Sequence, residues 1–249
     1  SSMSGIACSS FSNALVLNER IPVRQENRQL SGTPLSSVSE KLSMTTVLAI
    51  TSSASGAQSV SGRLVAEAVE ALKANGGVDR VITRDVGSDP IPHLTAETVG
   101  ALRTSEVKTE AERAAIALSD QLIGELREAD VIVIGAPMYN FGIPSTLKAW
   151  FDYVLRAGIT FRYSEKGPEG LLKGKRAIVI ESRGGLYSEG PAQAMDSQEP
   201  HLRTLLGFIG ITDVVFVRAE RQGFGPEASA EAVAAARGEL SRIGERLAA

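Results

Sequence analysis

The sequence predicts an α/β protein with a doubly wound, five-stranded parallel sheet and helices on both faces of that sheet. The first observation is that short apolar runs of strand length alternate with longer amphipathic segments. The second is that the run Val131–Ile134 contains no polar residue, as expected at the buried centre of a parallel sheet. The third is that loops rich in small residues follow several of the runs. Right-handed crossovers leave few topologies for such a chain.

Five segments are predicted to be strands because they combine apolar and β-branched residues over strand length. They are Val47–Thr51, Val81–Val86, Asp130–Ala136, Arg176–Glu181 and Asp213–Ala219. The predicted helices are Val60–Asn75, Ala96–Leu102, Glu110–Glu128, Pro144–Ala157, His201–Ile209 and Glu227–Leu247. Ligands of doubly wound sheets bind beyond the carboxyl ends of the strands. The loops after Thr51, Ala136 and Glu181 are therefore the places to search for a site.

Residues 1–43 differ from the rest of the chain. They are rich in serine and contain no convincing periodic segment, so we expect a disordered N-terminal extension or tag, and residues 44–249 to form the domain. A transit peptide is an alternative, although Glu19, Glu26 and Glu40 interrupt the acid-poor pattern of such peptides. Cys8 lies in this extension, and we expect no catalytic role for it.

Composition narrows the possible functions. A net charge of −3 gives no reason to expect nucleic acid or a membrane surface as a partner. The apolar runs are far shorter than the ~20 residues that span a bilayer. No signal-peptide core is present, and we expect a cytoplasmic protein. One cysteine and two histidines leave little material for a metal site, so we expect no metal.

The loop at 52–61 joins the first predicted strand to a helix and is rich in serine. Backbone N–H groups at a helix N-terminus lack partners and favour an anion, and serine hydroxyls add further donors. Because the loop contains no Lys or Arg, it suits a monophosphate; the Walker and G-x-G-x-x-G patterns are absent. The alternative is a simple capping loop, since Ser59 or Ser61 would cap a helix in any case.

The loop at 136–144 carries apolar and aromatic side chains, where a surface loop would normally be polar. Asn140 and Gly142 tolerate unusual backbone angles, and two prolines stiffen the turn. A flat, mostly apolar ring with polar edges would suit this wall, with Met138 and Phe141 touching its faces. The alternative is that these side chains pack under a lid.

The loop at 181–185 contains paired glycines directly after a predicted strand. Such glycines mark either close approach of the backbone to a ligand or a plain tight turn. Three loops of this kind at the ends of three parallel strands are more easily explained by one shared ligand than by three unrelated turns.

Five longer stretches resemble one family. They are 136–148 (APMYNFGIPSTLK), 156–163 (RAGITFRY), 167–170 (GPEG), 182–185 (SRGG) and 206–213 (LGFIGITD). They resemble the flavodoxin-like FMN-dependent NADH:azoreductases, a family also described as NADH:quinone oxidoreductases. The resemblance runs over essentially all of Met44–Ala249. It implies an oxidoreductase that takes hydride from NADH or NADPH and reduces quinones and azo compounds in a ping-pong sequence. It also implies a homodimer with residues of both subunits around each flavin.

The resemblance also assigns site residues. It implies that the FMN phosphate binds to Ser53, Ser59, Val60 and Ser61, that Met138, Tyr139, Asn140 and Phe141 flank the isoalloxazine ring, that Ser182, Arg183, Gly184 and Gly185 bind the pyrimidine side, and that Phe161 and Tyr163 form a substrate wall. Val60 stands where a polar residue often occurs in the family, but its backbone N–H can still donate. Because the flavin carries the redox chemistry, we expect no catalytic side chain.

Two alternative functions come from other classes. An electron-carrying flavodoxin would be a binding module for redox partners, but such carriers are strongly acidic and would not need the long segment Gly158–Leu172, which suggests a covered substrate pocket. A hydrolase on an α/β sheet would require a G-x-S-x-G nucleophile elbow, which the sequence lacks.

Overall fold

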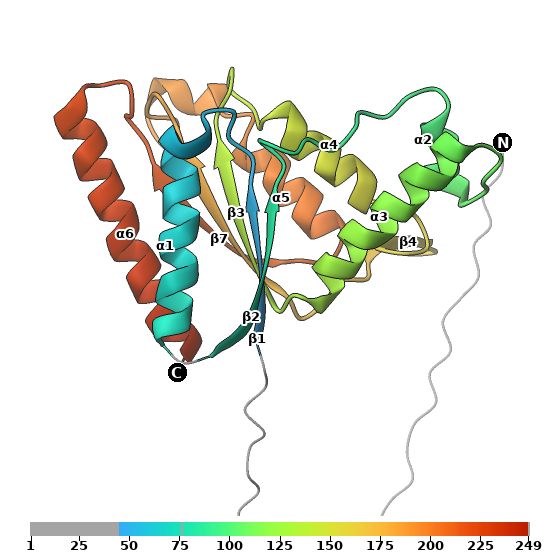
Figure 1. The fold of residues 1–249 in the computed structure, drawn as a ribbon. Coiled ribbons are helices and arrows are strands. Elements are labelled where there is room, and N and C mark those ends of the chain that lie inside the picture. Colours follow the sequence, from blue (N-terminus) through green and yellow to red (C-terminus); the bar gives the residue numbers. More distant parts are fainter. Residues whose placement is uncertain (1–44, 76, 249) are drawn as a thin grey trace, which may run out of the picture. The chain divides into compact units, whose positions relative to one another are not determined.

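A computed structural model describes the chain over residues 45–75 and 77–248. Its centre is a five-stranded sheet in the order β2-β1-β3-β6-β7, with all neighbouring strands parallel (Figure 1). The strands are β1 (Thr45–Thr51), β2 (Val78–Asp85), β3 (Val131–Pro137), β6 (Arg176–Ser182) and β7 (Asp213–Ala219). The predicted five-stranded parallel sheet is therefore confirmed. The predictions for residues 1–43, including Cys8, lie outside the described residues.

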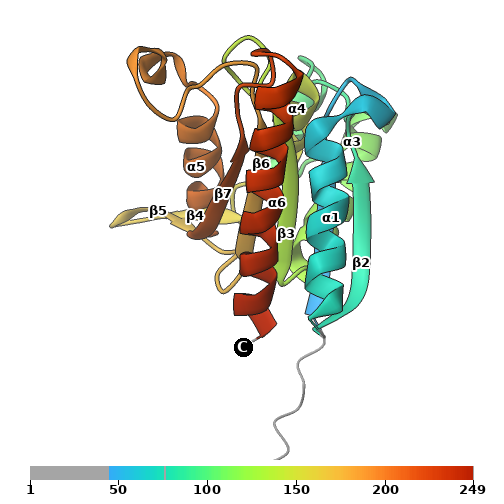
Figure 2. The ribbon, with the colours of Figure 1, turned by 90° about the vertical axis from the view of Figure 1, so that its left-hand side faces the viewer.

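Helices cover both faces of the sheet, as predicted (Figure 1, Figure 2). Val47 and Ala49 of β1 face one side, while Leu48 and Ile50 face the other, because successive side chains of a strand point in opposite directions. The first side packs against α1 (Val60–Ala74) and α6 (Pro226–Ala248). The second side packs against α3 (Glu110–Glu128), α4 (Ser145–Val154) and α5 (Glu199–Phe208), and the short α2 (Thr98–Thr104) contacts α3. Among the described helices, none is long and apolar enough to cross a membrane.

The hydrogen bonds at its first turn explain why α3 begins at Glu110. The Oγ1 of Thr109 accepts a hydrogen bond from the Glu112 backbone N–H at 3.2 Å, and the Glu112 carboxylate accepts one from the Thr109 N–H at 2.9 Å. This reciprocal capping box satisfies donors that have no helical partner.

Replacing Thr109 by Ala is expected to lower the free energy of unfolding by about 1 kcal/mol, because the first turn of α3 loses its capping oxygen. Thr109→Ser keeps that oxygen and is the matched control, with an expected change close to zero. Urea denaturation of both variants measures the difference. Equal losses in the two variants would show that the methyl group of Thr109, and not its capping bond, stabilises this helix end.

Residues 155–170 differ from the sequence prediction. Helix α4 was predicted to reach Ala157, but it ends at Val154 because Thr160 competes for its last backbone groups. The Oγ1 of Thr160 donates to the Val154 carbonyl at 2.6 Å and accepts from the Arg156 N–H at 2.9 Å. The segment Gly158–Leu172 then forms an antiparallel hairpin of β4 (Phe161–Ser164) and β5 (Gly167–Gly170), which was not predicted.

Smaller differences occur at other element ends. Strand β2 begins at Val78, three residues earlier than predicted, and α5 begins at Glu199 because Asp196 accepts hydrogen bonds from the Gln198 and Glu199 N–H groups at 2.8 and 3.1 Å. Two 3₁₀ turns, η1 (Gly56–Gln58) and η2 (Pro191–Met195), lie in loops that were predicted without structure.

Candidate functional site

The three loops selected from the sequence meet at the carboxyl end of the sheet. Strand β1 lies between β2 and β3, so the chain winds outward in both directions from the β1–β3 pair, the place where doubly wound sheets bind ligands. The Tyr139 Oη accepts a hydrogen bond from the Ala54 N–H at 3.0 Å and lies 3.3 Å from the Ser53 Oγ. The Met138 N–H donates to the Ser182 carbonyl at 2.8 Å. Direct contacts therefore join all three loops.

A cavity of about 190 Å³ lies between these loops. Its lining residues come from all three loops and from one further segment. They are Ser53, Ser55, Gln58, Ser59, Val60, Pro137, Met138, Tyr139, Ser182, Arg183, Gly184 and Gln222. Among the described residues, no group of His, Cys, Asp or Glu side chains has the arrangement of a metal site.

The serine loop has the geometry of an anion site. The Ser59 Oγ caps α1 by accepting from the Gly62 N–H at 2.9 Å, and the Ser61 Oγ lies 3.2 Å from it. The N–H groups of Val60 and Ser61 belong to the first helical turn, where no preceding helical carbonyl accepts them. The capping role and an anion-binding role are therefore compatible, because the cap uses a different N–H group.

The turn after β3 carries its aromatic rings at the surface. Tyr139 and Gly142 exchange two backbone hydrogen bonds, and Asn140 and Phe141 between them adopt positive φ values of 49° and 72°. The unusual angles fall on Asn140, as predicted, and on Phe141, whereas Gly142 has none. A left-handed conformation costs a phenylalanine about 1–3 kcal/mol and is concentrated at functional sites. Phe141 is 40% exposed, so it does not pack under a lid.

Tyr139 connects the aromatic turn to the serine loop. Burial opposes ionisation of its phenol, but hydrogen bonds with Ser53, the Ala54 N–H and Ser55 outweigh burial and lower the pKa of Tyr139 below its ordinary value. These hydrogen bonds fix the orientation of the Tyr139 phenol at the cavity.

The loop after β6 presents backbone donors. A ladder of hydrogen bonds from the segment Glu220–Gly225 occupies the carbonyls of Arg183, Gly184 and Gly185 at 2.9–3.0 Å. In the part of the chain that the structure describes, the N–H groups of Gly184 and Gly185 donate to no backbone carbonyl. The side chain of Arg183 points away from the cavity and is fully buried, so this residue lines the site with its backbone.

Comparison with known proteins identifies the family. Residues 45–243 match a family model described as having the flavodoxin-like fold. The chain is 55% identical over 203 residues to the FMN-dependent NADH:quinone oxidoreductase of Hyphomonas neptunium, covering 81% of this chain and 97% of that protein. The chain belongs to the FMN-dependent NADH:quinone oxidoreductase family. The corresponding protein of Azotobacter vinelandii is 49% identical, with 80% of this chain and all of the relative covered.

Solved structures agree with the fold of this family. A Bacillus anthracis azoreductase superposes with a TM-score of 0.73 at 30% identity, covering 82% of this chain and 100% of that one. An FMN-dependent NADH-azoreductase from Bacillus anthracis in complex with FMN gives a TM-score of 0.75 at 27% identity, covering 83% of this chain and 100% of that one.

One wall of the site in this family member was missed from the sequence. The segment Glu220–Gly225 after β7 pairs with the loop of β6, and its Gln222 lines the cavity. Gly223 and Gly225, shortly after a predicted strand, could have indicated this segment, because ligands of doubly wound sheets bind beyond the carboxyl ends of the strands.

The two predicted wall residues lie apart from the other site residues. Phe161 on β4 is 8% exposed, and its ring packs against Phe208 with a centroid distance of 4.6 Å. Tyr163 is 74% exposed and packs edge-on against Phe161 at 5.7 Å. Neither residue lines the cavity between the loops.

Proposed function

We propose that this protein binds FMN in the cavity between the loops and uses NADH or NADPH to reduce quinones and azo compounds. The observation that carries the proposal is the convergence of unlike binding surfaces at one sheet edge. A helix N-terminus suited to phosphate, Met138 and Tyr139 of the aromatic turn, and the glycine loop at Gly184 surround the same space. The proposal is supported by the names of the relatives, which are FMN-dependent NADH:quinone oxidoreductases.

The serine loop would hold the phosphate of FMN. The donors would be the N–H groups of Val60 and Ser61 together with the hydroxyls of Ser53 and Ser59. A hydrogen bond to a charged group contributes about 1.5–3 kcal/mol, so a few such donors suffice without a lysine. The helix dipole of α1 adds favourable electrostatics for the anion.

The other two loops would hold the flavin ring. Met138, Tyr139, Asn140 and Phe141 would flank it, and the loop Ser182–Gly185 would meet its pyrimidine edge. When bound, FMN supplies the hydride acceptance and the electron storage of the reaction. The backbone N–H groups of Gly184 and Gly185 would stabilise negative charge developing at the pyrimidine edge, because they are fixed by the ladder to Glu220–Gly225.

The nicotinamide and the second substrate would use the same exposed aromatic surface in turn, which gives a ping-pong order. Phe161 and Tyr163 lie outside the cavity of their own subunit, so they would reach a substrate only from a second subunit. The exposure of Tyr163, at 74%, supports a homodimer in which this hairpin covers the partner's site. We place this enzyme in the cytoplasm and propose no metal, nucleic-acid or membrane partner.

Anaerobic stopped-flow spectroscopy of the FMN-loaded protein tests the activity. NADH or NADPH should bleach the flavin absorption, and a soluble quinone or an azo dye should restore it. The protein mixed with quinone alone is the control and should show no change. An electron-carrying flavodoxin would bind FMN without rapid reduction by either nicotinamide, and this outcome would refute the enzymatic proposal.

Replacing Val60 by Pro is expected to weaken FMN binding about ten- to hundredfold, the equivalent of one lost hydrogen bond to a charged group. Proline is well tolerated at the first helical position, and the extended Ser59 (φ −65°, ψ 122°) accommodates a following proline. Val60→Ala keeps the N–H group and should retain wild-type affinity. Fluorescence titration of FMN measures both. Unchanged affinity in Val60→Pro would exclude this N–H as a phosphate donor.

A further inference from the structure

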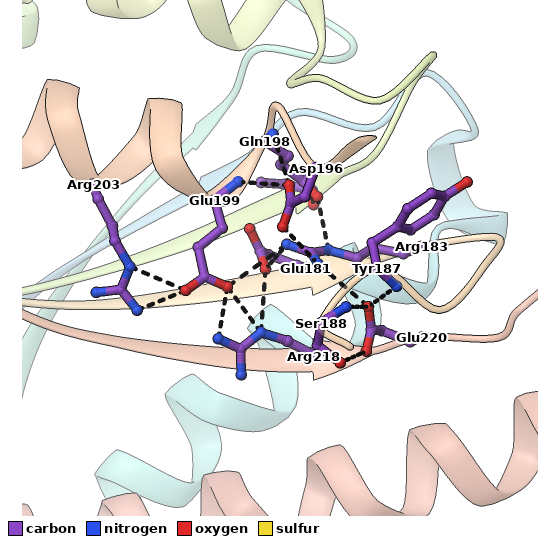
Figure 3. Close-up of polar contacts among 11 residues, drawn as sticks. Glu181, Arg183, Tyr187, Ser188, Asp196, Gln198, Glu199, Arg203, Arg218 and Glu220 are labelled. Atoms are coloured by element: carbon purple, nitrogen blue, oxygen red, sulfur yellow. Dashed lines mark hydrogen bonds and ion pairs between the residues drawn. The ribbon is translucent and has the colours of Figure 1, made fainter. Parts of the chain in front are cut away.

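The side chain of Arg183 is the centre of a buried polar network beneath the β6 loop (Figure 3). Its guanidinium is completely buried and lies close to hydrogen-bond acceptors on both sides of the loop. These acceptors are Gln198 at 3.0 Å, Asp196 at 3.1 Å, Glu220 at 3.3 Å, Glu181 at 2.5 Å and, at a longer distance of 3.7 Å, Glu199. One side chain therefore joins β6, the connection between η2 and α5, and the end of β7.

The first connection runs from Arg183 to the aromatic turn. The Arg183 Nε donates to the Gln198 Oε1, and the Gln198 Nε2 donates to the Ala136 carbonyl near the end of β3 at 2.7 Å. The neighbouring Ser197 N–H donates to the Phe141 carbonyl at 3.0 Å. The guanidinium thus fixes the segment that hydrogen-bonds to Phe141 in the aromatic turn.

The second connection runs from Arg183 to the far side of the glycine pair. The Arg183 Nη1 donates to the Glu220 Oε1, which also accepts from the N–H groups of Tyr187 and Ser188 at 2.8 and 3.0 Å. The Tyr187 ring contacts the Phe141 ring edge-on at a centroid distance of 6.1 Å. The two connections therefore meet again at the aromatic turn.

The planar geometry of arginine is what this arrangement requires. A guanidinium offers five N–H donors in a rigid fork, whereas a lysine ammonium is a compact charge on a flexible stem. Outside the centre, Arg203 and Arg218 both bind Glu199 at 2.6 Å, and Arg218 also lies 4.0 Å from the Glu181 carboxylate. A lysine at this position would supply the positive charge of Arg183, but it could not donate hydrogen bonds in the same three directions.

We infer that Arg183 is a positioning residue, whose side chain sets the relative placement of the aromatic turn and the Ser182–Gly185 loop around the FMN ring without itself touching the cofactor. This inference rests on the proposed function, because it takes these loops to be the FMN site. It also assigns separate roles to the backbone of Arg183, which lines the cavity, and to its side chain, which supports the walls.

Arg183→Lys tests the inference, with Arg203→Lys as the matched control at an exposed member of the same network. FMN affinity is measured by fluorescence titration, and the orientation of the bound ring by visible circular dichroism. Arg183→Lys should raise the FMN dissociation constant by about tenfold. Metal sites lose affinity by at least this factor when a residue that orients a ligand is removed, and Arg183 orients the binding loops in the same way. Its flavin dichroism should also change, whereas Arg203→Lys should match the wild type in both measurements.

Two further variants separate positioning from general loss of stability. Leu122→Ala opens the buried core at α3, away from the loops, and should lower the unfolding midpoint while leaving the flavin dichroism unchanged. Ser188→Ala removes only the hydroxyl contact with Glu220, so it should fold and show a smaller change of the same kind as Arg183→Lys.

The outcomes distinguish this inference from the proposed function. Wild-type protein that binds no FMN would overturn both. Wild-type binding together with unchanged affinity and dichroism in Arg183→Lys would overturn the positioning role alone. If Arg183→Lys does not fold, Ser188→Ala decides: a changed dichroism supports the role, and a spectrum identical to the wild type overturns it.

Discussion

Raising the pH from about 5 to about 8 is expected to lower the free energy of unfolding through Glu181 by up to about 1.4 kcal/mol per pH unit. Burial raises the pKa of the Glu181 carboxyl from its ordinary value of 4.5 to about 8. Between these values the folded protein holds a proton that the unfolded chain has released. Increasing pH therefore favours the unfolded chain, and the effect ends above the folded-state pKa, where both states are ionised.

The surroundings of Glu181 explain why this carboxyl keeps its proton. After burial, the neighbouring Glu199 and Asp196 raise the pKa further, while Arg183 opposes them. Arg183 shares its charge with other carboxylates, and within the described chain the Glu181 Oε1 has no hydrogen-bond partner. Asp196 and Glu220, by contrast, each accept two backbone N–H groups in addition to contacting Arg183.

Glu181→Gln provides the test, because glutamine keeps the shape of the neutral acid and does not titrate. Urea denaturation at several pH values should show the wild type losing stability relative to this variant as the pH rises, with the variant the more stable protein at about pH 8. Glu128→Gln removes an exposed carboxylate paired with Arg80 and should show no such trend. A stability difference that stays constant with pH would show that Glu181 is already ionised at the lower pH.

The fold could be predicted because the relevant signals are local. The apolar run of β3 and the caps and periodicity of α1 and α3 are properties of neighbouring residues, and the structure confirms these elements. The convergence of three loops could also be predicted, because it follows from the rule that parallel strands end at one edge of the sheet. The resemblance then named the residues of each loop.

What could not be predicted depends on specific contacts that residue preferences do not encode. The end of α4 is set by Thr160, whose hydroxyl returns to the Val154 carbonyl, and no local pattern encodes that return. The inward direction of Arg183 depends on Glu220, 37 residues away. Unusual backbone angles were expected at Asn140 and Gly142 from residue preference; Asn140 adopts one, but within the turn closed by the paired hydrogen bonds of Tyr139 and Gly142 the second falls on Phe141. In each case a specific contact overrides the preference of the single residue.

The loop after β2 packs against the backbone of the serine loop, a contact that was not predicted from the sequence. A Cβ placed on Gly87 would lie 2.3 Å from the Ser53 carbonyl oxygen and 2.9 Å from its carbonyl carbon, distances at which the backbone itself must move. Gly87 is also tied to β2, since its N–H donates to the Asp85 Oδ1 at 3.0 Å. The strain of a substitution therefore falls on Ser53 and the proposed phosphate site.

Gly87→Ala is accordingly expected to weaken FMN binding about a hundredfold, the loss that a displacement of roughly 1 Å at a binding group can cause. It should also lower the free energy of unfolding by about 1–3 kcal/mol, the usual cost of overpacking. Gly100→Ala is the control, because its Cβ would meet no atom within 4 Å. This substitution should raise the stability of helix α2 by about 0.5–1 kcal/mol, because alanine has the higher helix propensity. Isothermal titration with FMN and urea denaturation measure the two effects. If Gly87→Ala binds FMN as tightly as the wild type, the backbone of Ser53 does not determine phosphate binding, and the donors of α1 must hold the cofactor alone.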